Sequence, residues 1–158
     1  MHEFPEGLRH YVDDAPQVGR VEAILVRPQK RGDVQLTDSW TLGDASVDHG
    51  AERDKRQVTL IQAEHIDVIG KLLGRAVPWT DFRRNVLVSG LNLDACLRGE
   101  FSVGDVVLRG TMRADPCNRM ETNLGPGAYL AMLGHGGICA AVVQTGTIRV
   151  GDVVRWRG

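Results

Sequence analysis

The feature that most constrains the fold is a series of short apolar runs separated by glycine-containing turns. The chain has 158 residues, of which 19 are glycine. The longest apolar run in its second half, Ile138 to Val143, covers only six residues, whereas a membrane-spanning helix needs about 20. Many turns between short strands are typical of β-rich domains. We therefore expect a soluble, mainly β fold with a few short helices.

Apolar periodicity gives the expected order of strands and helices. Strands are expected at 18–28, at 34–42 as its paired strand, at 57–62 and at 86–88, with short strands dominating after residue 91. The clearest helix is 63–73, ended by Gly74, and a helical turn is expected at 129–133. The pattern Val-Gly-Asp-Val-Val occurs at 103–107 and again at 150–154, which predicts two similar tight turns and favours a barrel.

Length and composition predict one domain and exclude several classes of function. We expect a flexible N-terminal arm over residues 1–17 and a single domain over 18–158. The chain carries 19 basic and 20 acidic residues, so the basic excess usual in nucleic-acid binders is missing. The first residues contain no apolar segment of a secretory signal. These features indicate a cytoplasmic protein with neither a nucleic-acid nor a membrane partner.

Three widely spaced cysteines predict free thiols rather than a disulfide framework or a zinc site. Cys96 and Cys139 lie in apolar surroundings and are expected to be buried as small hydrophobic residues. Cys117 differs, because it follows Pro116 in a polar loop that also contains Arg119. Arginines near a loop thiol favour the reactive thiolate, so Cys117 is the candidate nucleophile or metal ligand, with a structural role as the alternative.

Other candidate residues lie in polar or glycine-rich loops. Arg83 and Asn85 belong to a loop rich in arginine, and guanidinium and amide groups bind phosphate oxygens; a solvated loop paired to Asp81 is the alternative. Asp48 and His49 lie in a loop rich in ionisable groups. His135 lies in Gly-His-Gly-Gly at 134–137, where the backbone can approach a ligand closely. A solvated histidine is the alternative at residue 49.

Taken in order, these segments resemble the MOSC domain, named for the C-terminal domain of molybdenum cofactor sulfurases. The resemblance runs from about residue 18 to residue 156. It rests on the order and spacing of Val-Thr-Leu-Ile at 58–61, Phe-Arg-Arg-Asn at 82–85, Ser-Gly-Leu-Asn at 89–92, Val-Gly-Asp at 103–105, Asp-Pro-Cys at 115–117, His-Gly-Gly at 135–137, Gly146 and Val-Gly-Asp at 150–152.

The resemblance implies a MOSC-type β-barrel and a molybdenum cofactor held by this domain. In this family the cysteine matching Cys117 carries sulfur or ligates molybdenum, and the residues matching Arg83 and Asn85 help to hold the pterin. Arg119 matches a basic residue found in some members. The segment at 46–49 matches a Gly-Asp-x-His type motif but lacks its glycine. His135 is added as a further candidate for cofactor binding.

Three functions are compatible with these expectations. The first is a molybdenum-cofactor-dependent oxidoreductase that reduces N-hydroxylated compounds, taking electrons from a separate protein. The second is a sulfur carrier or cofactor-delivery module with a persulfide on Cys117, loaded by a sulfur-donor protein. The third is a non-catalytic domain whose site has decayed. Nothing in the chain resembles a pyridoxal-phosphate domain, so that cofactor is not expected. The assembly is expected to be a monomer or homodimer.

Overall fold

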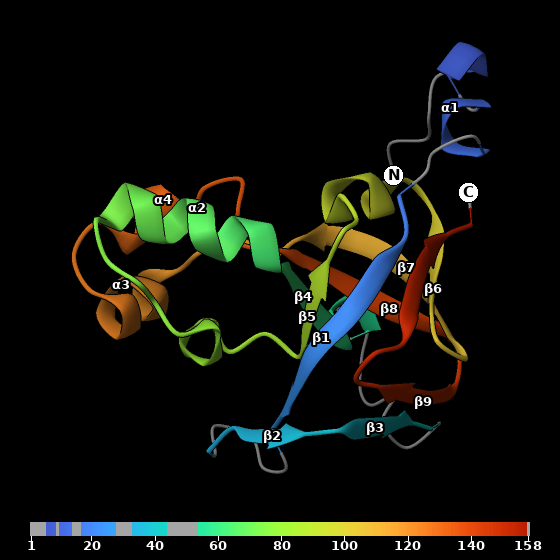
Figure 1. Cartoon of the computed structure of the whole chain (residues 1–158), viewed down its shortest axis with the longest axis horizontal. Helices are drawn as coiled ribbons and strands as arrows, with labels where there is room; N and C mark the ends of the chain where they lie inside the picture. The colour runs from blue at the N-terminus through green and yellow to red at the C-terminus, as the bar shows by residue number, and fades with distance from the viewer. Residues whose placement is uncertain (1–5, 9, 14–16, 28–32, 44–53, 158) are drawn as a thin grey trace.

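The computed structural model describes residues 6–8, 10–13, 17–27, 33–43 and 54–157. Ten strands and several short helices make up these ranges (Figure 1). The strands are β1 (Gly19–Val26), β2 (Gln35–Thr37), β3 (Ser39–Leu42), β4 (Val58–Gln62), β5 (Val86–Ser89), β6 (Glu100–Val103), β7 (Val106–Arg113), β8 (Ile138–Gln144), β9 (Gly146–Arg149) and β10 (Val153–Trp156). The helices are η1 (Glu6–Leu8), α1 (His10–Asp13), η3 (Asp54–Arg56), α2 (Ala63–Leu73), η4 (Trp79–Phe82), η5 (Leu93–Arg98), α3 (Asn118–Leu124) and α4 (Ala128–Met132).

Seven of the strands close into a barrel. Their order is β10-β6-β7-β8-β4-β5-β1, and β1 pairs with β10 to close the circle. The pairing of β4 with β5 is parallel and the other pairings are antiparallel. Closure removes the exposed sheet edges that would otherwise template aggregation. The expected mainly β, barrel-type fold is therefore confirmed.

The strand expected over 34–42 is divided in the structure. Residues 35–37 form β2, which pairs with β1 as expected, but residues 39–42 form β3, which pairs with β9 instead. The chain turns at Asp38, whose carbonyl accepts a hydrogen bond from the N–H of Val150 at 3.0 Å. A pairing partner more than a hundred residues away leaves no signal in the local apolar pattern.

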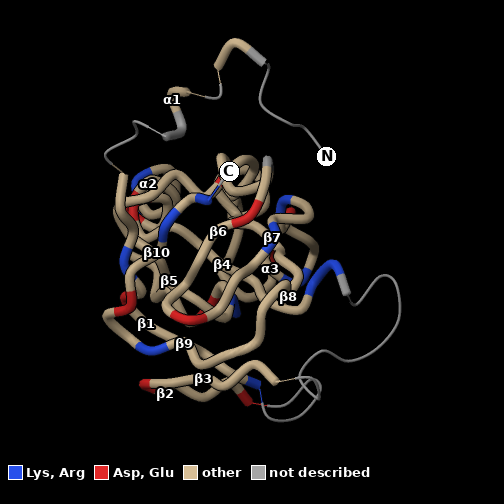
Figure 2. Tube along the Cα trace, turned by 90° about the vertical axis from the view of Figure 1, so that its right-hand side faces the viewer, with Lys and Arg blue, Asp and Glu red and all other residues tan. Residues whose placement is uncertain are grey.

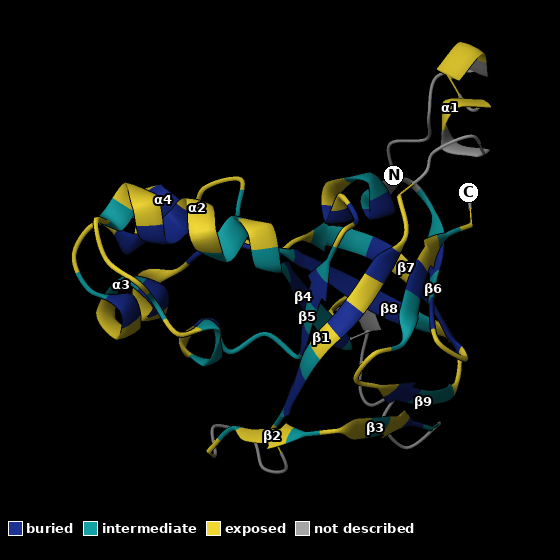
Figure 3. Cartoon of the chain, viewed as in Figure 1, coloured by how far each residue is buried: buried dark blue, intermediate teal, exposed yellow. Residues whose placement is uncertain are grey.

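Strand alternation creates two hydrophobic cores on opposite sides of β4 and β5. Leu60 and Val86 face the barrel interior, whereas Ile61 and Leu87 face a second cluster formed with the helices. Helices α2, α3 and α4 form a layer beside the barrel, and the outward side of α2 is exposed (Figures 1 and 3). Buried Phe82 joins η4 to this second core.

Helix α2 agrees with the expected helix residue for residue. It ends at Gly74, which adopts a left-handed conformation with φ of 70° and caps the helix through the carbonyls of Gly70 and Lys71. The expected turn near residue 129 is α4.

In the described ranges, no helix is long and apolar enough to cross a membrane. Short basic and acidic stretches are scattered along the trace, between longer stretches of other residues (Figure 2).

Candidate functional site

One row of paired residues across the barrel brings the candidate loops together. Ile24 pairs with Val86, Val86 with Leu60, Leu60 with Ile138, and Ile138 with Arg113. The row therefore lies near the end of β1, the beginning of β5, the beginning of β8 and the end of β7. The segments that continue from these four points contain the arginines, the Gly-Gly turn and the cysteine loop, although they lie far apart in the sequence.

Cys117 lies at the point where the chain leaves β7 and begins α3. It is the residue preceding α3, has extended backbone angles, and its carbonyl accepts a hydrogen bond from the N–H of Met120 at 2.9 Å. All three cysteines are free, and of these only Cys117 is exposed. Burial raises the pKa of Cys96 to about 12 and raises that of Cys139 as well. The expectation that Cys96 and Cys139 are buried is confirmed, and Cys117 is the accessible thiol.

Arg84 braces the backbone on both sides of this cysteine loop. Its Nε donates to the carbonyl of Gly136 at 2.9 Å, and its terminal Nη2 donates to the carbonyl of Ala114 at 3.0 Å. Burial lowers the pKa of Arg84, nearby Cys139 and Cys117 act in the opposite direction, and Arg27 lowers it further. The guanidinium thus lies within electrostatic range of the exposed thiol. Sequence reasoning recognised the arginine-rich loop but did not single out Arg84.

Two further arginines, Arg83 and Arg119, lie within electrostatic range of Arg27, and the three come from three segments of the chain. Partial burial lowers the pKa of Arg27, and the charges of Arg83 and Arg119 lower it further. Arg27 follows β1, Arg83 ends η4 with φ of 58°, and Arg119 lies in the first turn of α3, two residues after Cys117. We call Arg27, Arg83 and Arg119 the arginine cluster. A concentration of positive charge is typical of a site that binds an anion. Arg27 was missed by sequence reasoning, which treated it only as the end of a strand.

Asn85 is bonded within the barrel wall. Its side-chain oxygen accepts hydrogen bonds from the N–H and the hydroxyl of Thr59, each at 3.0 Å, and its amide nitrogen donates to the carbonyl of Leu25 at 3.0 Å. These contacts join β4 and β1 to the beginning of β5. The structure thus gives Asn85 a bracing position beside the arginine cluster, with its amide directed at protein groups.

His135 precedes Gly136 and Gly137. The carbonyl of Gly136 accepts a hydrogen bond from Arg84, and that of Gly137 accepts one from the N–H of Ala114. Its Nδ1 lies 3.1 Å from the carbonyl of Ala131, and its ring packs against that of His65 in α2. Asp48 and His49, the other two candidates, lie outside the described residues. Among the described residues, no group of three or more His, Cys, Asp and Glu side chains could hold a metal ion.

A model of the MOSC domain family matches residues 46–155. The chain belongs to the MOSC domain family. This is the family that the motif order predicted, and its name derives from the C-terminal region of molybdenum cofactor sulfurases. The match includes Cys117, Arg83 and Arg119 but not Arg27. No curated protein is similar enough in sequence to be matched.

Solved structures of other MOSC-type proteins have the same fold. The YuaD protein of Bacillus subtilis aligns with a TM-score of 0.69 at 16% identity, over 89% of this chain and 97% of that one. YiiM of Geobacillus stearothermophilus aligns with a TM-score of 0.70 at 19% identity, over 88% and 75%. YiiM of Escherichia coli aligns with a TM-score of 0.66 at 15% identity, over 88% and 70%. At these identities the likeness establishes the fold alone.

Proposed function

We propose that this MOSC domain binds the molybdenum cofactor through Cys117 and reduces N-hydroxylated compounds with electrons from a separate donor protein. The observation that carries the proposal is the exposed thiol of Cys117 beside a cluster of three arginines. The residues present suit the cofactor. Molybdenum accepts a soft thiolate ligand, and guanidinium groups match the oxygens of the pterin phosphate.

Each group in the site has a separate task in this proposal. Cys117 supplies the thiolate ligand, while Arg27, Arg83 and Arg119 hold the phosphate. Arg84 and Asn85 keep the surrounding loops in place through hydrogen bonds to backbone carbonyls and to Thr59. When bound, the cofactor supplies the two-electron redox chemistry. Each turnover would consume two electrons and two protons, break the N–O bond, and release the amine and water.

The arginine cluster can be tested separately from the thiol. Arg27→Ala and Arg119→Ala should each lower the affinity for the cofactor by roughly tenfold or more, because each removes a charge-assisted hydrogen bond to phosphate worth about 1.5–3 kcal/mol. Arg155→Ala is the matched control, since Arg155 is exposed on β10 at a distance from this end of the barrel. Molybdenum and pterin bound per chain would be measured after expression in a host that makes the cofactor. Equal occupancy in all four proteins would contradict the phosphate site.

The redox reaction needs an assay of its own. The loaded protein should reduce an N-hydroxylated base when reduced methyl viologen supplies the electrons, and Cys117→Ser should abolish this turnover. A loaded protein without turnover would contradict the oxidoreductase proposal. In that case, a gain of about 32 Da on Cys117 that dithiothreitol removes would instead support the sulfur-carrier function.

A further inference from the structure

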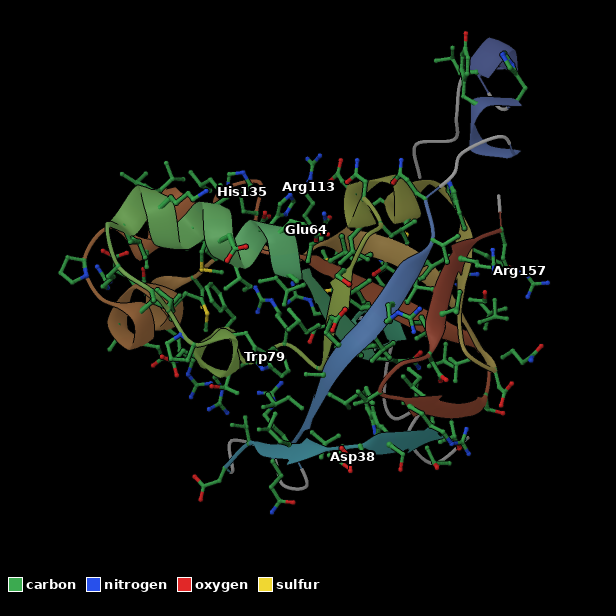
Figure 4. All side chains as sticks on the ribbon, viewed as in Figure 1. Asp38, Glu64, Trp79, Arg113, His135 and Arg157 are labelled. Carbon is green, nitrogen blue, oxygen red and sulfur yellow. The ribbon has the colours of Figure 1, made fainter. Side chains whose placement is uncertain are left out.

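A pair of histidines lies outside the Cys117 site. His65 comes from α2 and His135 from the turn before β8, and their ring centroids are 5.0 Å apart with the planes at 71°. Both side chains are half-buried and therefore remain accessible from solvent. In Figure 4, His135 lies on the same side of the molecule as Glu64 and Arg113. Neither the arginine cluster nor the cysteine loop uses these two rings.

The hydrogen bond of His135 leaves one ring nitrogen available. Its Nδ1 lies 3.1 Å from the carbonyl of Ala131, and only a protonated nitrogen can donate to a carbonyl. In the neutral ring the Nε2 lone pair is then open. A ligating histidine in a metal site typically donates its other ring N–H in this way, which fixes the tautomer and the ring orientation. Among the described residues His65 has no hydrogen-bond partner, so its ring can turn toward His135.

The spacing and the charges around the pair also suit a metal ion. With metal–nitrogen bonds of about 2.0 Å, two imidazoles on one tetrahedral ion have centroids roughly 5 Å apart. Burial lowers the pKa of His65, His135 lowers it further, and Glu64 and Asp94 act in the opposite direction. The neutral imidazole that a metal needs is therefore favoured, and two carboxylates contribute negative potential.

Those two carboxylates already have partners in the protein. Glu64 accepts a hydrogen bond from the N–H of Gly90 at 2.7 Å, and Asp94 binds Arg113 through two hydrogen bonds of 2.8 and 3.0 Å. The pair therefore offers two protein ligands and leaves the other positions to water. Such a site is open and exchangeable, unlike the closed four-ligand sites that hold structural zinc.

We propose that His65 and His135 form an open binding site for a divalent transition-metal ion such as Zn²⁺. Bound metal would join α2 to the turn containing Gly136, whose carbonyl accepts the hydrogen bond from Arg84. The ion would thereby clamp the backbone that braces the Cys117 loop. This site goes beyond the proposed cofactor function and does not depend on it.

Zinc titration of the full chain tests the site. All proteins would carry Cys117→Ser, which removes the competing exposed thiol and the proposed cofactor ligand together. Isothermal titration calorimetry with ZnCl₂ should give one ion per chain for the parent. His65→Gln and His135→Gln should each weaken binding at least tenfold, because each removes one of two protein ligands. His10→Gln is the matched control, since His10 is exposed and far along the chain from this pair, and it should leave this binding unchanged.

Two results would overturn the proposal. One is the absence of zinc binding by the parent in a titration at about 100 µM protein. A weak site with a dissociation constant in the micromolar range would still be detected at that concentration. The other is an unchanged affinity in both His65→Gln and His135→Gln. Circular dichroism and the unfolding midpoint of each variant without metal would establish that it is folded. His65→Gln is the decisive variant here, because it removes no hydrogen bond among the described residues.

Discussion

Asn85 makes three side-chain hydrogen bonds at the candidate site. Its amide joins Thr59 of β4 to Leu25 of β1, accepting two hydrogen bonds and donating one. Because these bonds hold the backbone at Asn85, they also fix the position of the backbone from which Arg83 and Arg84 project. Its contribution to cofactor binding would then be indirect, through the position of the arginine-rich loop.

Replacing Asn85 should therefore lower stability. Asn85→Ala leaves the N–H of Thr59 and the carbonyl of Leu25 without these partners, and we expect the free energy of unfolding to fall by about 2–3 kcal/mol. Urea denaturation followed by circular dichroism measures the change. Asn123→Ala, at an exposed position in α3, serves as the control and should change stability by less than about 0.5 kcal/mol. Equal losses in the two variants would contradict the bracing role.

His65 makes stability depend on pH in a defined direction. Its pKa lies below the ordinary value of 6.5 in the folded protein, chiefly because of burial. The unfolded chain then binds the proton more readily, so this contribution to stability is lost as the pH falls below about 6.5. His65→Gln should lose less stability than the parent between pH 7 and pH 5, as measured by urea midpoints at each pH. Parallel pH profiles for the two proteins would show that His65 is not responsible.

At the scale of elements, close packing between turns and strands determines where the loops can lie. Gly137 begins the approach to β8 with φ of 91°, and a Cβ there would overlap the backbone carbonyl of Leu60. Gly151 has a similar φ of 92°, but a Cβ there would meet no atom within 4 Å. The two glycines thus differ in crowding while sharing the same backbone conformation.

This difference gives a matched pair of variants. Gly151→Ala should cost about 1–2 kcal/mol, because only the left-handed conformation is strained. Gly137→Ala should cost clearly more, because the β4–β8 contact must also move apart, and it should displace the turn that receives Arg84. Thermal unfolding of both variants measures the comparison. If the two variants lowered the thermal unfolding midpoint equally, the prediction would be contradicted, because the contact between Gly137 and Leu60 would then have relaxed without a cost in stability.

Local patterns predicted the elements better than they predicted the site. Helix α2 and strands β1, β4 and β5 follow from periodicity and from Gly74, because those signals lie within the element itself. The division of 34–42 at Asp38 depends on the pairing of β3 with β9, which is a long-range contact. Arg27 and Arg84 were missed for the same reason. Their roles depend on the row of paired residues from Ile24 to Arg113. The register of those strand pairs cannot be predicted from the neighbouring sequence or from composition.

At the scale of the whole molecule, the barrel is a closed frame, and the loops of the candidate site continue from the ends of four of its strands. Closure through β1 and β10 fixes the register of every strand between them. The register in turn places the exposed thiol of Cys117, the brace of Arg84 and the arginine cluster in one region. The order of motifs along the chain predicted the family, and the barrel explains how motifs so far apart form one site.

Metal analysis tests most directly whether Cys117 holds the molybdenum cofactor in this region. The parent and Cys117→Ser would be purified from a host that makes the cofactor, and molybdenum per chain would be measured in both. We expect close to one molybdenum per chain in the parent and almost none in the variant. Equal molybdenum in the two proteins, or none in the parent, would contradict it.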